Sequence, residues 1–387
     1  MKCSYIQRSK KSWTAIIDLG LKPDGKRNQK WITVPGTKKD AQTKAAEIIA
    51  EFNKGTYIEP AKTNVKEFLD HWLKTIKSNI GNKTHERYQE IINHHISPYL
   101  GQLKLNNLKP VHITGLYADL LDHGRRDGKG GLSKRSVLHA HRIFREALND
   151  AVKWEILARN PCDAVEPPTP EKSERLTFAT DETLLLLDKA RQSENSYLYL
   201  AVLIAVTTGL RLSEVIGLRW KDIDLDKARL SVRQVASQTR TYGIEYKEPK
   251  TQKSTRMIPL QQITVNGLNQ YRLEQARIFL QLGKRITGDN MVFDTPDGLY
   301  PPRRLTVTYR MFIKKHGFKH VTFHDLRHSH ATQLLEQNIH PKIVSERLGH
   351  STIALTMDTY SHVLPSMQES AISVMDQVFN KAKNKAG

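Results

Sequence analysis

The chain has 387 residues, enough for two or three domains, and its formal net charge of +20 excludes an acidic protein. No apolar run approaches the ~20 residues that a membrane span needs, and the basic N-terminus lacks the apolar stretch of a secretory signal. Cys3 and Cys162 are too few for a disulfide framework or a zinc site, so we expect a reducing cytoplasm and no membrane contact.

The positive charge is spread along the whole chain. Lys and Arg outnumber Asp and Glu in residues 1–60, in residues 61–170 and in residues 171–387. An extended contact with a polyanion is the natural interpretation, because each neutralised phosphate releases counterions. Charge alone fits a solvated basic surface equally well.

Residues 1–55 are predicted to form a small basic module. Apolar and polar residues alternate in residues 11–20 and 30–36, which predicts two strands, and residues 37–55 have the pattern of a helix. The face of such a sheet can enter a DNA groove. The alternative is a small appendage that only stabilises the protein.

Residues 62–166 are predicted to form a domain of about four helices. Two basic stretches lie at or near helix N-termini, where backbone N–H groups and side chains can contact phosphates together. Each stretch alone is more often a capped, solvated first turn. The candidate DNA-contacting residues are Lys83, Thr84, Arg87, Lys134, Arg135, His139 and Arg142.

Residues 174–387 follow a Pro-rich linker and begin with helices. Gly209 can end a strongly apolar helix, and residues 228–236, 244–250 and 255–260 are strand candidates for one small antiparallel sheet. The rest is predicted to be helical, down to an amphipathic tail at residues 366–387. The predicted fold is therefore mainly α with small antiparallel β-sheets, in several domains.

The stretch from 321 to 363 concentrates chemically useful side chains. His324 and Arg327 are three residues apart in a predicted helix, His350 follows the helix-ending Gly349, and Tyr360 comes ten residues later. Imidazoles, a guanidinium and a phenol suit a phosphate site with a potential nucleophile. The stretch lacks a carboxylate cluster suited to Mg²⁺.

The order of the motifs is more informative than any one of them. TTGLRLSEVIGLRW, PKT before TRMIPL, HDLRHSHAT, LGHS and MDTYSHV occur in one direction along one domain. This series resembles the tyrosine recombinases, also called the phage integrase family. The resemblance implies a catalytic set of Arg211, Lys250, His324, Arg327, His350 and the nucleophile Tyr360.

The chemistry of these residues agrees with the resemblance. Breaking a phosphodiester needs an in-line nucleophile, neutralised non-bridging oxygens and a proton for the leaving oxygen. Arg211 and Arg327 suit the phosphate, His324 suits the proton of Tyr360, and Lys250 suits the leaving 5′-oxygen. The product would be a 3′-phosphotyrosyl bond that another 5′-hydroxyl reseals, with no ATP, metal or other cofactor.

The resemblance also implies partners. We expect an integrase of a mobile element that binds double-stranded DNA at core sites through the helical domain and at separate arm sites through residues 1–55. Recombination requires a homotetramer on synapsed DNA. Accessory DNA-bending or excision factors are further candidate partners. We expect the protein at the nucleoid of a bacterial host.

Other classes of protein remain as alternatives. The same chemistry serves a resolvase-like or a type IB topoisomerase-like strand transferase. A non-catalytic DNA-binding protein of the same fold would not need both Lys250 and Tyr360. A metal nuclease would need an Asp and Glu cluster, which the sequence lacks.

Overall fold

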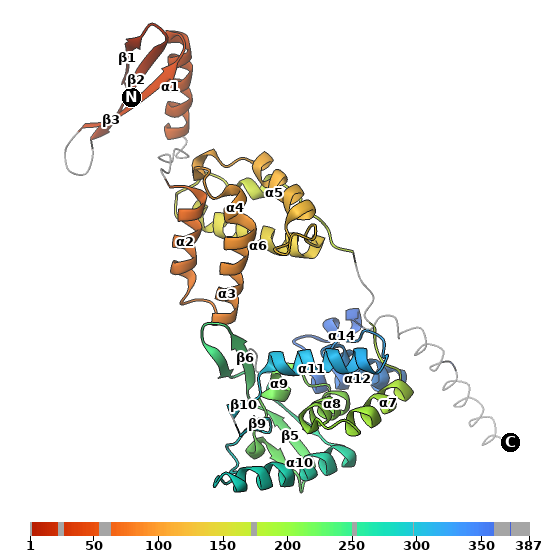
Figure 1. Cartoon of the computed structure of the whole chain (residues 1–387). Helices are drawn as coiled ribbons and strands as arrows, with labels where there is room; N and C mark the ends of the chain where they lie inside the picture. The colour runs from red at the N-terminus through yellow and green to blue at the C-terminus, as the bar shows by residue number, and fades with distance from the viewer. Residues whose placement is uncertain are drawn as a thin grey trace, which may run out of the picture. The chain divides into compact units, whose positions relative to one another are not determined.

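A computed structural model describes residues 2–21, 27–53, 63–171, 176–249, 254–296, 298–359 and 372. The chain divides into two compact units, residues 1–171 and residues 172–387, which are described separately (Figure 1). The first unit contains two hydrophobic cores, one in the N-terminal module and one in the helical bundle. The predicted division into three domains stays a prediction.

The N-terminal module is an antiparallel three-stranded sheet in the order β1-β2-β3, with helix α1 packed on it. Alternation predicted the second and third strands, but the first was missed. Ala15 and Ile17 are buried with Ala45 and Ile48 of the helix, so the apolar positions of one sheet face form this core. The bounds are β1 Lys2–Ser9, β2 Ser12–Leu21, β3 Arg27–Pro35 and α1 Lys38–Asn53.

The helical bundle begins with α2, Val65–Ile76, whose first residues are capped by Asn64 and Glu67 in a capping box. Apolar residues at helical spacing form its buried face, and Trp72 among them donates a 2.8 Å hydrogen bond to Asp150. The next helix begins at Asn82, so Thr84 lies within its first turn, and a π-helical segment, Ile92–Ile96, follows it directly. The other helices are α3 Asn82–Ile91, α4 Ser97–Leu100, α5 Pro110–His123 and α6 Lys134–Lys153.

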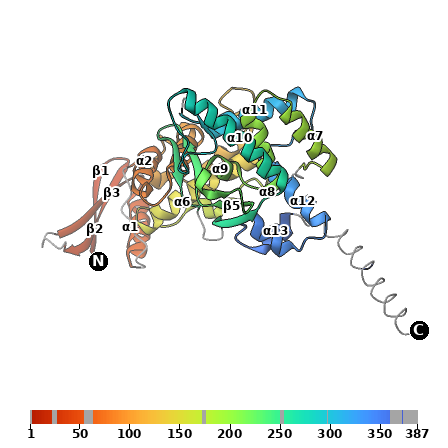
Figure 2. The ribbon, with the colours of Figure 1, turned by 90° about the horizontal axis from the view of Figure 1, so that it is seen from below.

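In the second unit, helices α7, α10 and α12 all contact the buried helix α8 (Figures 1 and 2). Apolar residues cover α8 on every side, which is typical of a helix in the middle of a core. The helices are α7 Thr180–Arg191, α8 Ser196–Thr208, α9 Leu212–Ile216, α10 Gln262–Gln281, α11 Pro302–Lys315, α12 Asp325–Glu336, α13 Pro341–Leu348 and α14 Ile353–Thr359.

The strands of this unit differ from the prediction of one sheet. Among the described strands, the one at residues 243–247 pairs only with residues 235–239, in a hairpin, and not with those at residues 229–232 and 256–259. The described strands therefore form separate small antiparallel sheets. One has the order β4-β5-β8, one is the β6–β7 hairpin, and the β9–β10 hairpin was not predicted. The bounds are β4 Ile223–Asp224, β5 Arg229–Val232, β6 Val235–Thr239, β7 Gly243–Lys247, β8 Arg256–Pro259, β9 Asp294–Thr295 and β10 Gly298–Leu299.

Among the described residues, no helix has the length and apolar character required to cross a bilayer. The predicted amphipathic tail lies outside the described residues, except for residue 372.

Candidate active site

Arg211 is positioned by the turn that ends α8. Gly209 adopts a left-handed conformation with φ of 69°, and a Cβ atom there would come within 2.6 Å of Leu348 and 2.7 Å of His330. Only glycine both adopts this left-handed conformation without strain and leaves the space that a Cβ atom would fill. Arg211 then stands at the N-cap of α9 with its side chain one-third exposed, and its Nη1 lies 2.7 Å from Oε1 of Glu214. The guanidinium is anchored and still reaches solvent.

Arg327 lies in the first turn of α12 and is only 2% exposed. Its Nη1 donates to the carbonyl of Gly209 at 2.9 Å, and its Nη2 donates to the carbonyl of Leu348 at 2.7 Å. One side chain therefore joins the turn before Arg211 to the end of α13. This pair of hydrogen bonds brings three distant motifs of the sequence together.

His350 follows α13, which ends at Gly349 with φ of 67°, as predicted. Its Nδ1 is 2.7 Å from the hydroxyl of Thr356 on α14. Burial, and then the positive charges of Arg327 and Arg211, lower the pKa of His350 to about 4. The imidazole is therefore neutral at pH 7 and can still donate one N–H.

The other three predicted catalytic residues are placed less fully. His324 is exposed, directly precedes α12, and its ring meets that of His328 edge-on at 5.2 Å. Lys250 and Tyr360 lie outside the described residues. The strand β8 begins six residues after Lys250, and α14 ends at the residue before Tyr360. Arg211, Arg327 and His350 are thus the predicted residues that the structure brings together.

A cavity of about 490 Å³ opens beside His350. Its lining includes Arg256 of β8 and residues 349–352, which connect α13 to α14. A concave surface with buried cationic groups nearby can bind an anion such as a phosphate diester.

Two charged residues at this site were not predicted. Glu214 is 1% exposed and accepts hydrogen bonds from Arg211 and Arg256. Glu214 stands three residues after Arg211 at a helix start, which is the capping-box spacing, and its carboxylate does accept the Arg211 backbone N–H at 2.9 Å. Arg256 lies two residues before the buried Ile258 in β8 and so shares its inward face; a charged residue at an inward strand position was the available signal.

A hydrogen-bonded pair of the half-buried Arg347 and the buried His330 supports the same region. Arg347 donates from Nε to Nε2 of His330 at 3.1 Å and from Nη2 to the carbonyl of Thr207 at 2.9 Å. His330 Nδ1 is 2.8 Å from the carbonyl of Val206, so Nδ1 carries the proton. Burial, followed by the charge of Arg347, lowers the pKa of His330 to about 4. This pair links α8, α12 and α13 without a charged imidazole.

Four of the basic residues predicted in the helical bundle lie near one another, one on α3 and three on α6. Burial lowers the pKa of His139 on α6, and the positive charges of Arg87, Arg142 and Arg135 lower it further, so Arg87 of α3 lies near the basic face of α6. Lys134 forms an ion pair with Glu171, with 3.4 Å between its Nζ and the carboxylate oxygen. Clustered cations of this kind suit a phosphate backbone.

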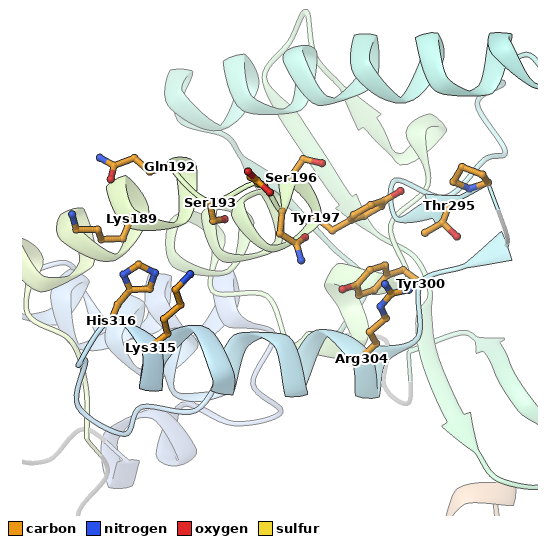
Figure 3. A pocket seen from close by; sticks show the side chains of 13 residues that line it. Lys189, Gln192, Ser193, Ser196, Tyr197, Thr295, Tyr300, Arg304, Lys315 and His316 are labelled. Atoms are coloured by element: carbon orange, nitrogen blue, oxygen red, sulfur yellow. The ribbon is translucent and has the colours of Figure 1, made fainter.

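A larger pocket of about 890 Å³ contains none of the predicted residues. Figure 3 shows Lys189 and Lys315 near one end of the pocket and Tyr300 and Arg304 near the other, between α7, α8 and α11. The pocket lies at the start of α8, whereas Arg211 follows its end. At 1.5 Å per residue, the 13 residues of α8 separate these two places by about 20 Å.

In the part of the chain that the structure describes, no group of three or more His, Cys, Asp or Glu side chains is arranged to hold a metal ion. The groups gathered around His350 are mainly cationic. Their common chemistry is the stabilisation of negative charge.

Comparisons with known proteins agree with this geometry. Residues 175–367 match the model of the phage integrase family, and residues 64–121 match the phage integrase N-terminal SAM-like domain. The "tyrosine recombinase XerC-like" protein of Caldanaerobacter subterraneus subsp. tengcongensis is 27% identical, over 98% of this chain and 99% of that protein.

Two solved structures show the same fold. The Tn1549 transposon integrase in complex with a circular intermediate DNA is 21% identical and covers 79% of this chain and 99% of that one, with a TM-score of 0.65. A lambda integrase tetramer bound to a Holliday junction is 19% identical and covers 90% of this chain and 95% of that one, with a TM-score of 0.54.

Proposed function

The chain belongs to the phage integrase family of tyrosine recombinases, and from this premise we propose that Tyr360 is the nucleophile of a site-specific DNA recombinase. The protein is an enzyme of the integrase type that cuts and rejoins DNA. Its proposed active site also contains Arg211, Lys250, His324, Arg327 and His350. The observation that carries this assignment is the pair of hydrogen bonds from Arg327, which joins the Arg211 turn to the end of α13.

Each residue has a defined task in the proposed cleavage step. The Tyr360 oxygen attacks the phosphorus, the phosphorus–5′-oxygen bond breaks, and a 3′-phosphotyrosyl bond forms. His324 accepts the phenol proton and Lys250 gives a proton to the leaving 5′-oxygen. Arg211, Arg327 and the neutral His350 hold the non-bridging oxygens as negative charge develops on them.

Rejoining is the reverse of cleavage with a different 5′-hydroxyl. The phosphotyrosyl ester keeps the bond energy of the original phosphodiester, so resealing needs no external energy source. When the attacking hydroxyl comes from a second DNA site, the outcome is an exchange of strands, as integration or excision requires.

A nicked suicide substrate tests this proposal. Loss of a short cleaved strand prevents resealing, so the wild-type protein should accumulate a covalent protein–DNA adduct in the presence of EDTA. Tyr360→Phe should form none, while the matched control Tyr242→Phe, at a residue that is 45% exposed, should behave as wild type. Cleavage that EDTA abolishes, without any adduct, would refute the assignment.

We propose two DNA-binding surfaces in the first unit. One is the basic cluster of α3 and α6 described above, for core sites. The other is the sheet face that carries Trp31, 53% exposed with Arg8 stacked on its ring at 5.6 Å, for arm sites. An exposed aromatic ring under a guanidinium offers both contact area and charge to DNA. Deleting residues 1–55 should weaken binding to arm DNA and spare cleavage at a core site; unchanged affinity for every DNA would refute the arm assignment.

We propose that the protein works as a homotetramer in contact with the nucleoid in the cytoplasm, with accessory DNA-bending or excision factors as further partners. Two DNA sites with two protomers each require four copies, and a lambda integrase tetramer is bound to a Holliday junction in a solved structure. Light scattering of the protein with core DNA should report four protomers and two sites. A complex that never exceeds one protomer per duplex would contradict this assembly.

A further inference from the structure

Arg256 is held on every side of its guanidinium. Its Nε donates to the carbonyl of Arg347 at 2.6 Å, and Nη1 and Nη2 donate to the two oxygens of Glu214 at 3.2 and 3.1 Å. Nη1 also donates to the carbonyl of Ser254 at 3.1 Å. The side chain is only 7% exposed, and the planar fork matches a carboxylate in a way that Lys cannot reproduce.

Glu214 is therefore shared between two arginines. Burial raises its pKa, but Arg256, followed by Arg211, outweighs burial, and the net pKa lies below its ordinary value. The carboxylate is ionised. Two guanidinium groups and one carboxylate leave one positive charge in the group, and Arg211 is the member that reaches solvent.

From this geometry we propose that Arg256 is a positioning and charge-compensating residue of the active site: it neutralises Glu214, so that Arg211 keeps its positive charge for the scissile phosphate. The proposal rests on the proposed function. Without Arg256, Glu214 and Arg211 would form a neutral pair, and the field that Arg211 presents to a developing phosphorane would be largely cancelled.

The same residue also holds the turn that carries His350. Arg256 bonds the Arg347 carbonyl, in the last turn of α13, and a Cβ atom on Gly349 would lie 3.0 Å from its Nη1. Arg256 is thus hydrogen-bonded to the last turn of α13 and lies close to Gly349, the residue that follows it. Moving it would shift His350 relative to Arg211, and small displacements of groups that stabilise charge cost large factors in rate.

Four variants test the proposal: Arg256→Met, Arg256→Lys, Glu214→Gln and the double variant Glu214→Gln with Arg256→Met. Single-turnover cleavage of the nicked substrate, the dissociation constant for core DNA and the melting temperature are measured for each. Arg256→Met should cleave about 10²-fold more slowly than wild type with DNA affinity nearly unchanged, because the lost term belongs to the transition state. Arg256→Lys keeps the positive charge but not the planar fork, so its cleavage rate should lie between those of wild type and Arg256→Met.

The double variant separates charge compensation from mere structural support. Glutamine still accepts the Arg211 backbone N–H but no longer neutralises its guanidinium, so the double variant should cleave about tenfold faster than Arg256→Met. Wild-type cleavage by Arg256→Met would overturn the inference, as would a double variant no faster than Arg256→Met. If Arg256→Met does not fold, Arg256→Lys is compared with its own Glu214→Gln double variant under the same two criteria. Absence of any wild-type adduct would instead refute the proposed function, and the inference with it.

Discussion

Arg327 and Arg211 are both proposed to hold the scissile phosphate, but the structure gives them different effects on stability. In Arg327→Lys, one ammonium replaces a fork that donates to the carbonyls of Gly209 and Leu348, so at least one buried carbonyl loses its donor. A hydrogen bond from a charged donor is worth about 1.5–3 kcal/mol. For a unit of this size, 1 kcal/mol corresponds to about 2–4 °C, so the melting temperature should fall by about 3–12 °C.

Arg211→Lys is the matched control. The side chain of Arg211 is one-third exposed, and a lysine there can keep an ion pair with Glu214, so the free energy of unfolding should change by less than about 1 kcal/mol. Differential scanning calorimetry of the full chain measures both variants, and the nicked substrate measures cleavage, which both should lose. Equal melting temperatures for the two variants would refute the assigned role of Arg327 in joining α8 to α13.

Three other predictions concern separate features. Gly349→Ala should lower the unfolding free energy by about 1–2 kcal/mol in urea titrations, because alanine is strained at φ of 67°; an unchanged value would contradict this. Burial holds the pKa of His330 at about 4, so below about pH 6.5 the unfolded chain binds a proton that the folded chain does not. The free energy of unfolding should therefore be highest at neutral pH and fall as the pH drops from about 6.5 to about 4, by up to about 1.4 kcal/mol per pH unit. In His330→Gln, the slope of the unfolding free energy against pH should be shallower over this range. Arg142→Gln should reduce the slope of log affinity for core DNA against log salt by about 0.9, and an identical slope would place Arg142 away from the phosphates.

Local signals predicted much of the fold. The apolar stripe of α2 is buried as its spacing predicted, and Gly209 and Gly349 both end helices in the left-handed conformation. These features depend on residues within a few positions of one another, so a sequence pattern contains them. Strand pairing does not have this property, which is why β7 was assigned to the wrong sheet and β1 was missed.

The motif residues of the candidate site were predicted, but their support was not. Arg327 bonds a carbonyl 118 residues away and Arg256 bonds a carboxylate 42 residues away, and such pairings exist only once the chain has folded. In the sequence, only the capping-box spacing of Glu214 and the strand position of Arg256 distinguish these two from ordinary charged residues. Once the chain has folded, Glu214 is buried, and a buried carboxylate requires a positively charged partner, which Arg256 supplies.

The central claim is that the phenol oxygen of Tyr360 takes over the scissile phosphate at the site formed around Arg211, Arg327 and His350. Mass spectrometry of the trapped adduct, after nuclease and protease digestion, tests it most directly. The account predicts a nucleotide remnant attached through phosphate to the peptide that contains Tyr360. A remnant on any other residue, or a cleaved strand with an unmodified 3′-phosphate and no modified peptide, would contradict it.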